Sequence, residues 1–238
     1  MLFLLIVSPV MALAQKNAVK LNLSSVAIRN YHVSYERAFG RNMSFNLGVR
    51  VMPKGKLPMQ ETFEDFGGLD DEDLQLGLFE IGNTSITPEV RFYLSKKAMK
   101  GFYIAPYARY ASFDLSLPFE YTYNDPTFGS HTKTALFTGK ITSFSGGLMF
   151  GTQFSLAKRL VLDIWWLGGH YGSSDGDLRL NVSIPTTEEQ NALRNTLNDF
   201  DPSPFEIESE VNASGAVIRS TGPWAGVRAL GINLGFRF

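Results

Sequence analysis

The stretch Ala229-Leu-Gly-Ile-Asn-Leu-Gly-Phe-Arg-Phe238 closes the chain and decides the fold. Bulky apolar residues at Leu230, Ile232, Leu234, Phe236 and Phe238 alternate with Ala229, Gly231, Asn233, Gly235 and Arg237. A repeat of two indicates a β-strand, because successive side chains of a strand point to opposite faces. One face is entirely apolar and the other is small or polar. A strand of a lipid-embedded β-barrel needs both faces, with lipid outside and a polar filling inside.

Working back from that strand, similar alternation recurs and predicts an all-β chain. The fold class that we expect is an eight-stranded antiparallel transmembrane β-barrel with a polar interior filled by side chains and with long extracellular loops. The mean hydropathy is near zero, which does not argue against it because the two faces of each strand cancel. The predicted strands cover 18–25, 31–39, 44–51, 81–94, 102–115, a sixth segment containing 143–154, 160–172 and a closing strand that includes 229–238.

The connections between these strands alternate in length and in charge. Three tight turns, 40–42, 96–101 and 157–159, contain basic residues and no acidic ones. The loops and links at the other end are longer: 26–30, 53–80, 116–138 and 173–221. Loop 53–80 has eight acidic residues against two lysines, and loop 173–221 has nine against three arginines. Short periplasmic turns and long extracellular loops are typical of outer-membrane barrels, so we expect both termini on the periplasmic side.

Residues 1–14 are apolar and end in Ala12-Leu13-Ala14, which predicts a signal peptide with a mature start at Gln15. No basic residue precedes the apolar run, so the beginning of this segment is expected to be truncated, or the segment is a buried part of a soluble protein. Residues 15–238 then form one barrel domain. Cysteine is absent, which excludes disulfides and a lipid-modified cysteine.

The inward phase of the predicted strands collects charges of both signs. A narrow eight-stranded interior is just wide enough for side chains, and buried charges need partners. We therefore expect an ionic network with a structural, plugging role, rather than a gated pore or a proton path. Its predicted members are Glu36, Arg50, Glu89, Arg91, Arg109 and Asp163, together with Tyr103 and Tyr107.

Histidine is the one residue type that leaves a catalytic or metal-binding alternative open. The three histidines, His32, His131 and His170, fall toward the loop end of the predicted strands, without the spacing of a metal motif. The acidic run 70–73 lacks the ligand spacing of a calcium loop. No phosphate-binding glycine loop, nucleophile motif or nucleic-acid motif is present. We expect no cofactor, no metal, no nucleic-acid partner and no enzyme activity.

Some local features give further expectations. Thr187 as N-cap and Gln190 three residues later predict a helix over about 187–199, between two extended arms, 177–184 and 205–219. Residues 116–138 are expected to extend a hairpin. Pro88 and Pro106 each lack a backbone donor, which predicts a β-bulge. Arg37 and Arg228 fall in the outward phase, where they would snorkel to lipid head groups.

Taken with the signal-like start, YERAFG at Tyr35–Gly40 and GFYIAPYARY at Gly101–Tyr110 resemble small outer-membrane barrels of Bacteroidetes, themselves similar to the OmpX/OmpA transmembrane type. The resemblance covers roughly 16–238. It implies a cell outer-membrane location, contact with outer-membrane lipid, and Phe236 and Phe238 as an assembly signal for the barrel-assembly machinery.

We expect a structural, adhesion or envelope-assembly protein that presents acidic loops to an extracellular or envelope protein partner. The alternatives are a lipid-modifying enzyme similar to PagP, using His32 and His170, and a narrow channel.

Overall fold

The computed structural model describes residues 16–56, 78–125 and 129–238, and these form a mostly β chain with nine antiparallel strands. The predicted signal peptide and most of loop 53–80 lie outside the described residues. In chain order the elements are β1 Asn17–Asn22, α1 Leu23–Val26, β2 Tyr31–Ala38, β3 Met43–Lys56, β4 Glu80–Tyr93, β5 Gly101–Asp125, β6 Gly129–Ser155, β7 Leu160–Leu180, α3 Thr187–Asp199, β8 Glu206–Asn212 and β9 Gly215–Arg237.

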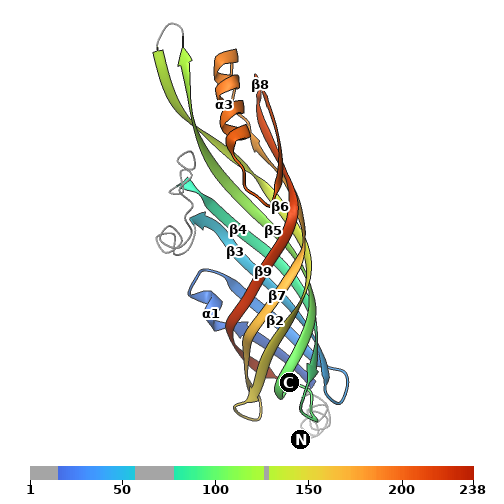
Figure 1. Ribbon diagram of the computed structural model, residues 1–238. Coiled ribbons are helices and arrows are strands. Elements are labelled where there is room, and N and C mark those ends of the chain that lie inside the picture. The colour runs from blue at the N-terminus through green and yellow to red at the C-terminus, as the bar shows by residue number, and fades with distance from the viewer. Residues whose placement is uncertain (1–15, 57–77, 126–128) are drawn as a thin grey trace, which may run out of the picture.

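Eight of the strands close into a hydrogen-bonded ring (Figure 1). Neighbours in sequence pair from β1 to β7, β7 pairs with β9, and β9 returns to β1 through Ala18 opposite Arg237 and Leu21 opposite Leu234. Backbone bonds between Asn17 and Phe238 of 3.1 and 2.9 Å complete the seam. The predicted eight-stranded antiparallel ring is confirmed. The ninth strand, β8, was not predicted and pairs with β9 outside the ring.

The two ends of the ring differ, as Figure 1 shows. At the turn end, short connections join β2 to β3, β4 to β5 and β6 to β7. At the other end β5, β6, β7 and β9 run beyond their neighbours into a projection that we call the cap. The cap consists of 115–125, 129–141, 176–180 and 215–221 with α3 and β8. The expected hairpin extension at 116–138 is confirmed, because β5 and β6 pair as far as Asp125 and Gly129.

The first strand is shorter than predicted because Asn22 ends it. Its side-chain oxygen accepts hydrogen bonds from the backbone of Ser25 at 2.7 Å and from the hydroxyl of Ser24 at 2.9 Å. An asparagine in this role starts a helix, so Leu23–Val26 form the single turn α1 and do not continue the alternation.

Side chains in the ring are polar inside and apolar outside. On β9, Asn233 is fully buried while Leu234 and Phe236 are 40% and 47% exposed. The same contrast appears on β2, where His32, Ser34 and Glu36 face inward. The other strands add to an outward apolar surface that includes Val19, Leu21, Val33, Tyr35, Phe45, Leu47, Val49, Ile86, Phe92, Phe102, Phe144, Leu148, Phe150, Leu167 and Ile232.

One irregularity reverses the expected orientation of Arg228. Trp166 and Leu167 of β7 are both exposed, as are Ala229 and Leu230 of β9, and Leu230 has a φ of 50°. These pairs of consecutive outward residues lie side by side, since Leu167 pairs with Ala229. Beyond them the alternation is shifted by one residue. The predicted outward placement of Arg228 is therefore wrong: its side chain is 6% exposed and lies inside, whereas Arg37 is exposed as expected.

The expected bulge at the two prolines is also wrong. The register between β4 and β5 keeps one offset past them, with Ile86 opposite Tyr110, Glu89 opposite Tyr107 and Phe92 opposite Ile104. The prolines interrupt paired positions without adding a residue, so the strands stay in phase. Register shifts occur instead between Met52 and Gly55 and between Phe150 and Gly151.

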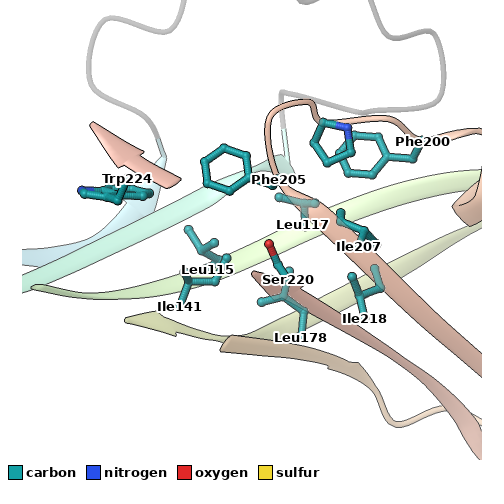
Figure 2. Close-up of a pocket in the computed structure, with 11 residues that line it drawn as sticks. Leu115, Leu117, Ile141, Leu178, Phe200, Phe205, Ile207, Ile218, Ser220 and Trp224 are labelled. Atoms are coloured by element: carbon teal, nitrogen blue, oxygen red, sulfur yellow. The ribbon is translucent and has the colours of Figure 1, made fainter. Parts of the chain in front are cut away.

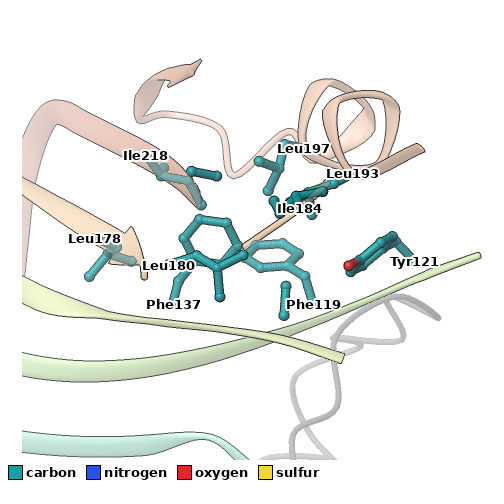
Figure 3. Packing of buried hydrophobic residues seen from close by; sticks show 11 residues of the cluster. Phe119, Tyr121, Phe137, Leu178, Leu180, Ile184, Leu193, Leu197 and Ile218 are labelled. Carbon is teal, nitrogen blue, oxygen red and sulfur yellow. The ribbon is translucent and has the colours of Figure 1, made fainter. Parts of the chain in front are cut away.

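The cap has a core of its own, shown in Figure 3. Leu193 and Leu197 of α3 pack on the strand residues Phe119, Phe137 and Ile218. The helix spans the predicted residues, but its N-cap is Thr186, whose hydroxyl accepts from the backbone of Glu189 at 3.3 Å. Gln190 donates instead to the carbonyl of Ile184 at 2.8 Å, so the predicted capping box is wrong by one residue. The predicted second arm, 205–219, is divided between β8 and β9.

Candidate functional site

The interior near the turn end holds a cluster of buried ion pairs from five strands. Asp163 of β7 receives Lys20 Nζ of β1 and Arg91 Nη1 of β4, each at 2.6 Å from its Oδ2. Lys20 also pairs with Glu36 of β2. Arg91 Nη2 lies 2.8 Å from Glu89 Oε2, and Arg228 Nη1 of β9 lies 3.0 Å from Glu89 Oε1. Three cations thus meet three carboxylates across the full width of the ring.

Neutral groups complete the coordination of these carboxylates. The Tyr103 hydroxyl donates to Asp163 Oδ1 at 2.8 Å, and the Tyr93 hydroxyl donates to Glu36 Oε1 at 2.5 Å. Ser44 also donates to Glu36, and Asn46 Nδ2 donates to Glu89 Oε2 at 3.1 Å. A buried ion pair is tolerated when additional hydrogen bonds satisfy its remaining lone pairs, which is the arrangement here. The cluster fills the lumen and ties opposite strands together.

The structure brings together only some of the charged residues that were predicted to face inward. Of the six predicted members, the structure brings Glu36, Glu89, Arg91 and Asp163 into contact through ion pairs. Arg50 and Arg109 form no ion pair with any residue of the described chain and lie closer to the cap. Two members were missed. Lys20 could have been found because it alternates with Val19 and Leu21, whereas the inward position of Arg228 depends on the shift at Leu230.

Toward the cap, the lumen contains arginine, histidine and aromatic rings. The Arg228 guanidinium carbon lies 4.9 Å from the Tyr107 ring and 4.5 Å from the Trp165 ring, a double cation–π contact. His32 meets Trp165 edge to face, with ring centroids 5.0 Å apart. His170 Nδ1 is hydrogen-bonded to the Tyr107 hydroxyl at 3.1 Å.

The structure does not bring the three histidines into one site. His131 lies in the cap beside Tyr123, at 5.8 Å between ring centroids, while His32 and His170 face the lumen. Within 16–56, 78–125 and 129–238, no group of three histidine, cysteine or acidic residues is placed to hold a metal ion.

An apolar pocket lies where the cap meets the ring (Figure 2). Its volume is about 200 Å³. Phe200 and Phe205, which flank the link from α3 to β8, close one side, and Leu115, Ile141 and Ile218 of the strands line the other. Trp224 stands at one end against Phe113, with ring centroids 4.8 Å apart. The remaining lining residues are Leu117, Leu178, Pro202, Ile207 and Ser220.

The helix of the cap is fixed to the β5–β6 hairpin by a buried carboxylate. Glu189, which is 3% exposed, accepts from the Tyr121 hydroxyl and from Lys133 Nζ, both at 2.8 Å. Burial, followed by the hydrogen bond to Glu189, raises the pKa of Tyr121. The same carboxylate raises the pKa of Lys133 through its hydrogen bond. Both partners therefore stay protonated while α3 is docked.

Comparison with known proteins identifies the family. Within the described ranges, no helix is long and apolar enough to cross a bilayer. The chain matches none of the curated proteins and none of the solved structures with which it was compared. The DUF3575 family, described as "Protein of unknown function", matches residues 1–177. Since the match covers more than half of its length, the chain belongs to the DUF3575 family.

Proposed function

We propose that this chain is an integral outer-membrane protein whose eight-stranded ring spans the bilayer and holds the acidic cap at the cell surface. In this proposal the role is structural, in adhesion or in envelope assembly, and the chain is not an enzyme. The observation that carries it is the inverted arrangement of the ring. Leu21, Leu47 and Leu234 are exposed while Lys20, Glu36 and Asp163 are fully buried.

This arrangement is unfavourable in water. A water-soluble protein seldom exposes a contiguous apolar patch of more than a few hundred Å², and each Å² costs about 25 cal/mol relative to burial. The outward residues of every ring strand contribute to such a surface, so it would run around the whole ring. Lipid removes that cost. A ring closed by the pairing of β1 with β9 also leaves few backbone groups without a partner, as the hydrocarbon region requires.

The difference between the two ends supports the proposed orientation. The turn end has short connections, as the periplasmic side of such proteins does, and these connections contain Lys96, Lys158 and Arg159. The cap carries exposed carboxylates of β8, namely Glu206, Glu208 and Glu210, on the strand at the edge of the sheet. Charged side chains on an edge strand discourage pairing with a strand of another chain. We therefore propose that a partner binds the acidic side chains of the cap and does not add a strand to β8.

The filled lumen favours this role over the narrow channel. Arg91 and Asp163 meet across the interior with their side chains fully buried. An ion passing through would have to separate pairs whose disruption costs several kcal/mol. In planar bilayers the wild-type protein should therefore show no steady conductance, and a large steady conductance would contradict the plug.

Membrane insertion is tested with purified protein refolded into phospholipid vesicles. We expect the protein to float with the vesicles, to resist alkaline extraction, and to migrate faster on gels before boiling than after it. Replacement of Leu47 by Glu, on the outward face of β3, should reduce the inserted fraction, because a charge in hydrocarbon costs several kcal/mol. The matched control is Leu136→Glu, an exposed leucine of the cap portion of β6. A protein that stays monomeric in buffer without detergent would contradict the proposal.

Orientation is tested by labelling, since the chain contains no cysteine. Asn195→Cys places a thiol on the exposed face of α3, and Lys158→Cys places one in a turn at the opposite end. A membrane-impermeant maleimide added to intact cells should label the first and not the second. Both should react after lysis, and the reverse pattern would place the cap in the periplasm.

A further inference from the structure

Among the described residues, the lumen contains more positive charge than its carboxylates neutralise. The ion-pair cluster balances Lys20, Arg91 and Arg228 against three acids, so Arg50 and Arg109 are in excess. Arg228 is itself incompletely satisfied. It is 6% exposed, its one carboxylate partner Glu89 is shared with Arg91, and its Nε and Nη2 have no hydrogen-bond partner among the described residues. Arg50 Nε likewise has no hydrogen-bond partner among the described residues.

These arginines are close enough to repel one another. Arg50, Arg109 and Arg228 interact electrostatically inside the ring, where water screens charges poorly. Buried guanidinium groups with free N–H donors are stabilised by an anion that accepts from them, and planar guanidinium groups suit phosphate oxygens in particular.

A cavity connects two of these arginines. It has a volume of about 250 Å³ and is lined by Arg50 and Arg228, with Asn22 and Ser25 adding polar groups. A water molecule in the liquid occupies about 30 Å³, so there is room for a phosphate group and several waters. Trp165 also lines the cavity, which places an indole ring beside the guanidinium of Arg228.

The cavity reaches the outer surface of the ring through a gap in strand pairing. On the edge of β9 that faces away from β7, residues 233–237 pair with β1 and residues 215–221 pair with β8. Among the described residues, no strand pairs with 222–232 on that edge. The turn α1 stands in this gap, where the Ile232 amide donates to Ser24 Oγ at 3.2 Å. Ile28, Val227 and Leu230 line the mouth and are exposed.

We propose that Arg50 and Arg228 bind a phosphate group in this cavity, which enters between α1 and β9. The cationic interior and apolar mouth fit the phosphate of a membrane lipid whose acyl chains remain on the outer surface, and a free phosphate ion offers the same chemistry. Binding by the arginines does not depend on membrane insertion, whereas supply by a lipid rests on the proposed function.

The first experiment measures binding of inorganic phosphate by calorimetry to the full chain in dodecyl maltoside, against chloride. Arg50→Gln and Arg228→Gln should each weaken binding about tenfold or more, because each removes charge-assisted hydrogen bonds. Arg37→Gln is the matched control, since this arginine is exposed on the outside of β2. Arg228→Gln also removes a partner of Glu89 and could therefore prevent folding. If the Arg228→Gln variant does not fold, the result for Arg50→Gln decides the test.

The second experiment identifies the source of the phosphate. Trp166→Phe and Trp224→Phe leave Trp165 as the single tryptophan, because the chain has three. This variant is inserted into vesicles of digalactosyldiacylglycerol, which contains no phosphate, with or without phosphatidic acid. A shift of Trp165 emission with phosphatidic acid that Arg50→Gln abolishes identifies a lipid source, and a shift with added inorganic phosphate alone identifies the free ion.

The proposal is overturned if neither phosphate source binds, or if Arg37→Gln weakens binding as much as Arg50→Gln. This failure is distinguishable from a failure of the proposed function. A chain that remained soluble without detergent could still be titrated with inorganic phosphate in buffer.

Discussion

Four strands, β5, β6, β7 and β9, pass through both the ring and the cap, and their inward face changes chemistry between them. In the ring that face carries Asp163 and Asn233, both fully buried. In the cap the corresponding face of β7 and β9 carries Leu178 and Ile218. On β5 the alternation keeps one phase from Tyr103 to Tyr121, whereas on β7 and β9 it shifts by one residue at Leu167 and Leu230.

The difference shows that burial alone does not determine which residues a strand turns inward. The cap packs apolar side chains under α3, as a water-soluble domain does, and places Arg179 and Arg219 outside. The ring does the opposite, which the proposed lipid surroundings explain because they remove the advantage of burying apolar groups. Predictions that separate the two regions therefore test the proposal as well as the fold.

The largest effect is expected from Asp163→Asn in the ring. The change leaves Lys20 and Arg91 without the carboxylate that each contacts at 2.6 Å. Removing one partner of a buried ion pair destabilises a protein by about 3–5 kcal/mol. Urea unfolding from vesicles, followed by the mobility shift on gels, measures the loss. Asp199→Asn, at an exposed position at the end of α3, is the control and should change stability by less than about 0.5 kcal/mol. Equal losses would show that the cluster contributes little.

In the cap, Leu193→Ala is expected to act locally. Leu193 is fully buried in the cap core, and truncation of a buried leucine costs about 2–5 kcal/mol. The cap should loosen while the ring persists, because the two cores share no residues. Hydrogen exchange should accelerate in α3 and β8 and remain slow in β1 to β4. Faster exchange throughout the chain would contradict two separate cores.

The ring could be predicted from sequence because its signal is repeated in every strand. Val19-Lys20-Leu21 and Phe45-Asn46-Leu47 both show the two-residue period, and with an even number of strands the first and last strands run antiparallel and can pair. The charged interior could be predicted in the same way, as Glu36, Glu89, Arg91 and Asp163 occupy the inward phase.

Other features depend on backbone geometry that sequence patterns do not reveal. The positive φ of Leu230 shifts the phase of β9 and turns Arg228 inward, although leucine is not a residue that signals such a conformation. Asn22 ends β1 through a side-chain hydrogen bond while the apolar alternation continues to Leu23. The excess of arginine near the cap depends on the same shift, because the shift brings Arg228 inside the ring with Arg50 and Arg109.

Alkaline pH should release the cap helix before the ring unfolds. The folded-state pKa of Tyr121 and of Lys133 lies above its ordinary value, so the stabilisation is complete below about pH 10 and is lost as pH rises through the raised values. A fluorophore on Asn195→Cys should then gain mobility. Tyr121→Phe removes the phenolic proton and should leave a weaker transition due to Lys133. A fluorophore whose mobility does not rise at any pH below that at which the ring itself unfolds would exclude this coupling.

The smallest effect distinguishes between two candidates for the N-cap residue of α3. The Thr186 hydroxyl accepts from the Glu189 amide at 3.3 Å, so Thr186→Ala should destabilise the helix by about 1 kcal/mol. Thr187 is the first residue inside the helix, and Thr187→Ala should have no comparable effect because alanine is the stronger helix former. The comparison is made by hydrogen exchange of α3 in the folded protein. A larger effect of Thr187→Ala would restore the capping box that the sequence predicts, and it would move the start of the helix one residue along the chain. Glu189 would then take a different position in the first turn, and its contacts with Tyr121 and Lys133 would have to rearrange.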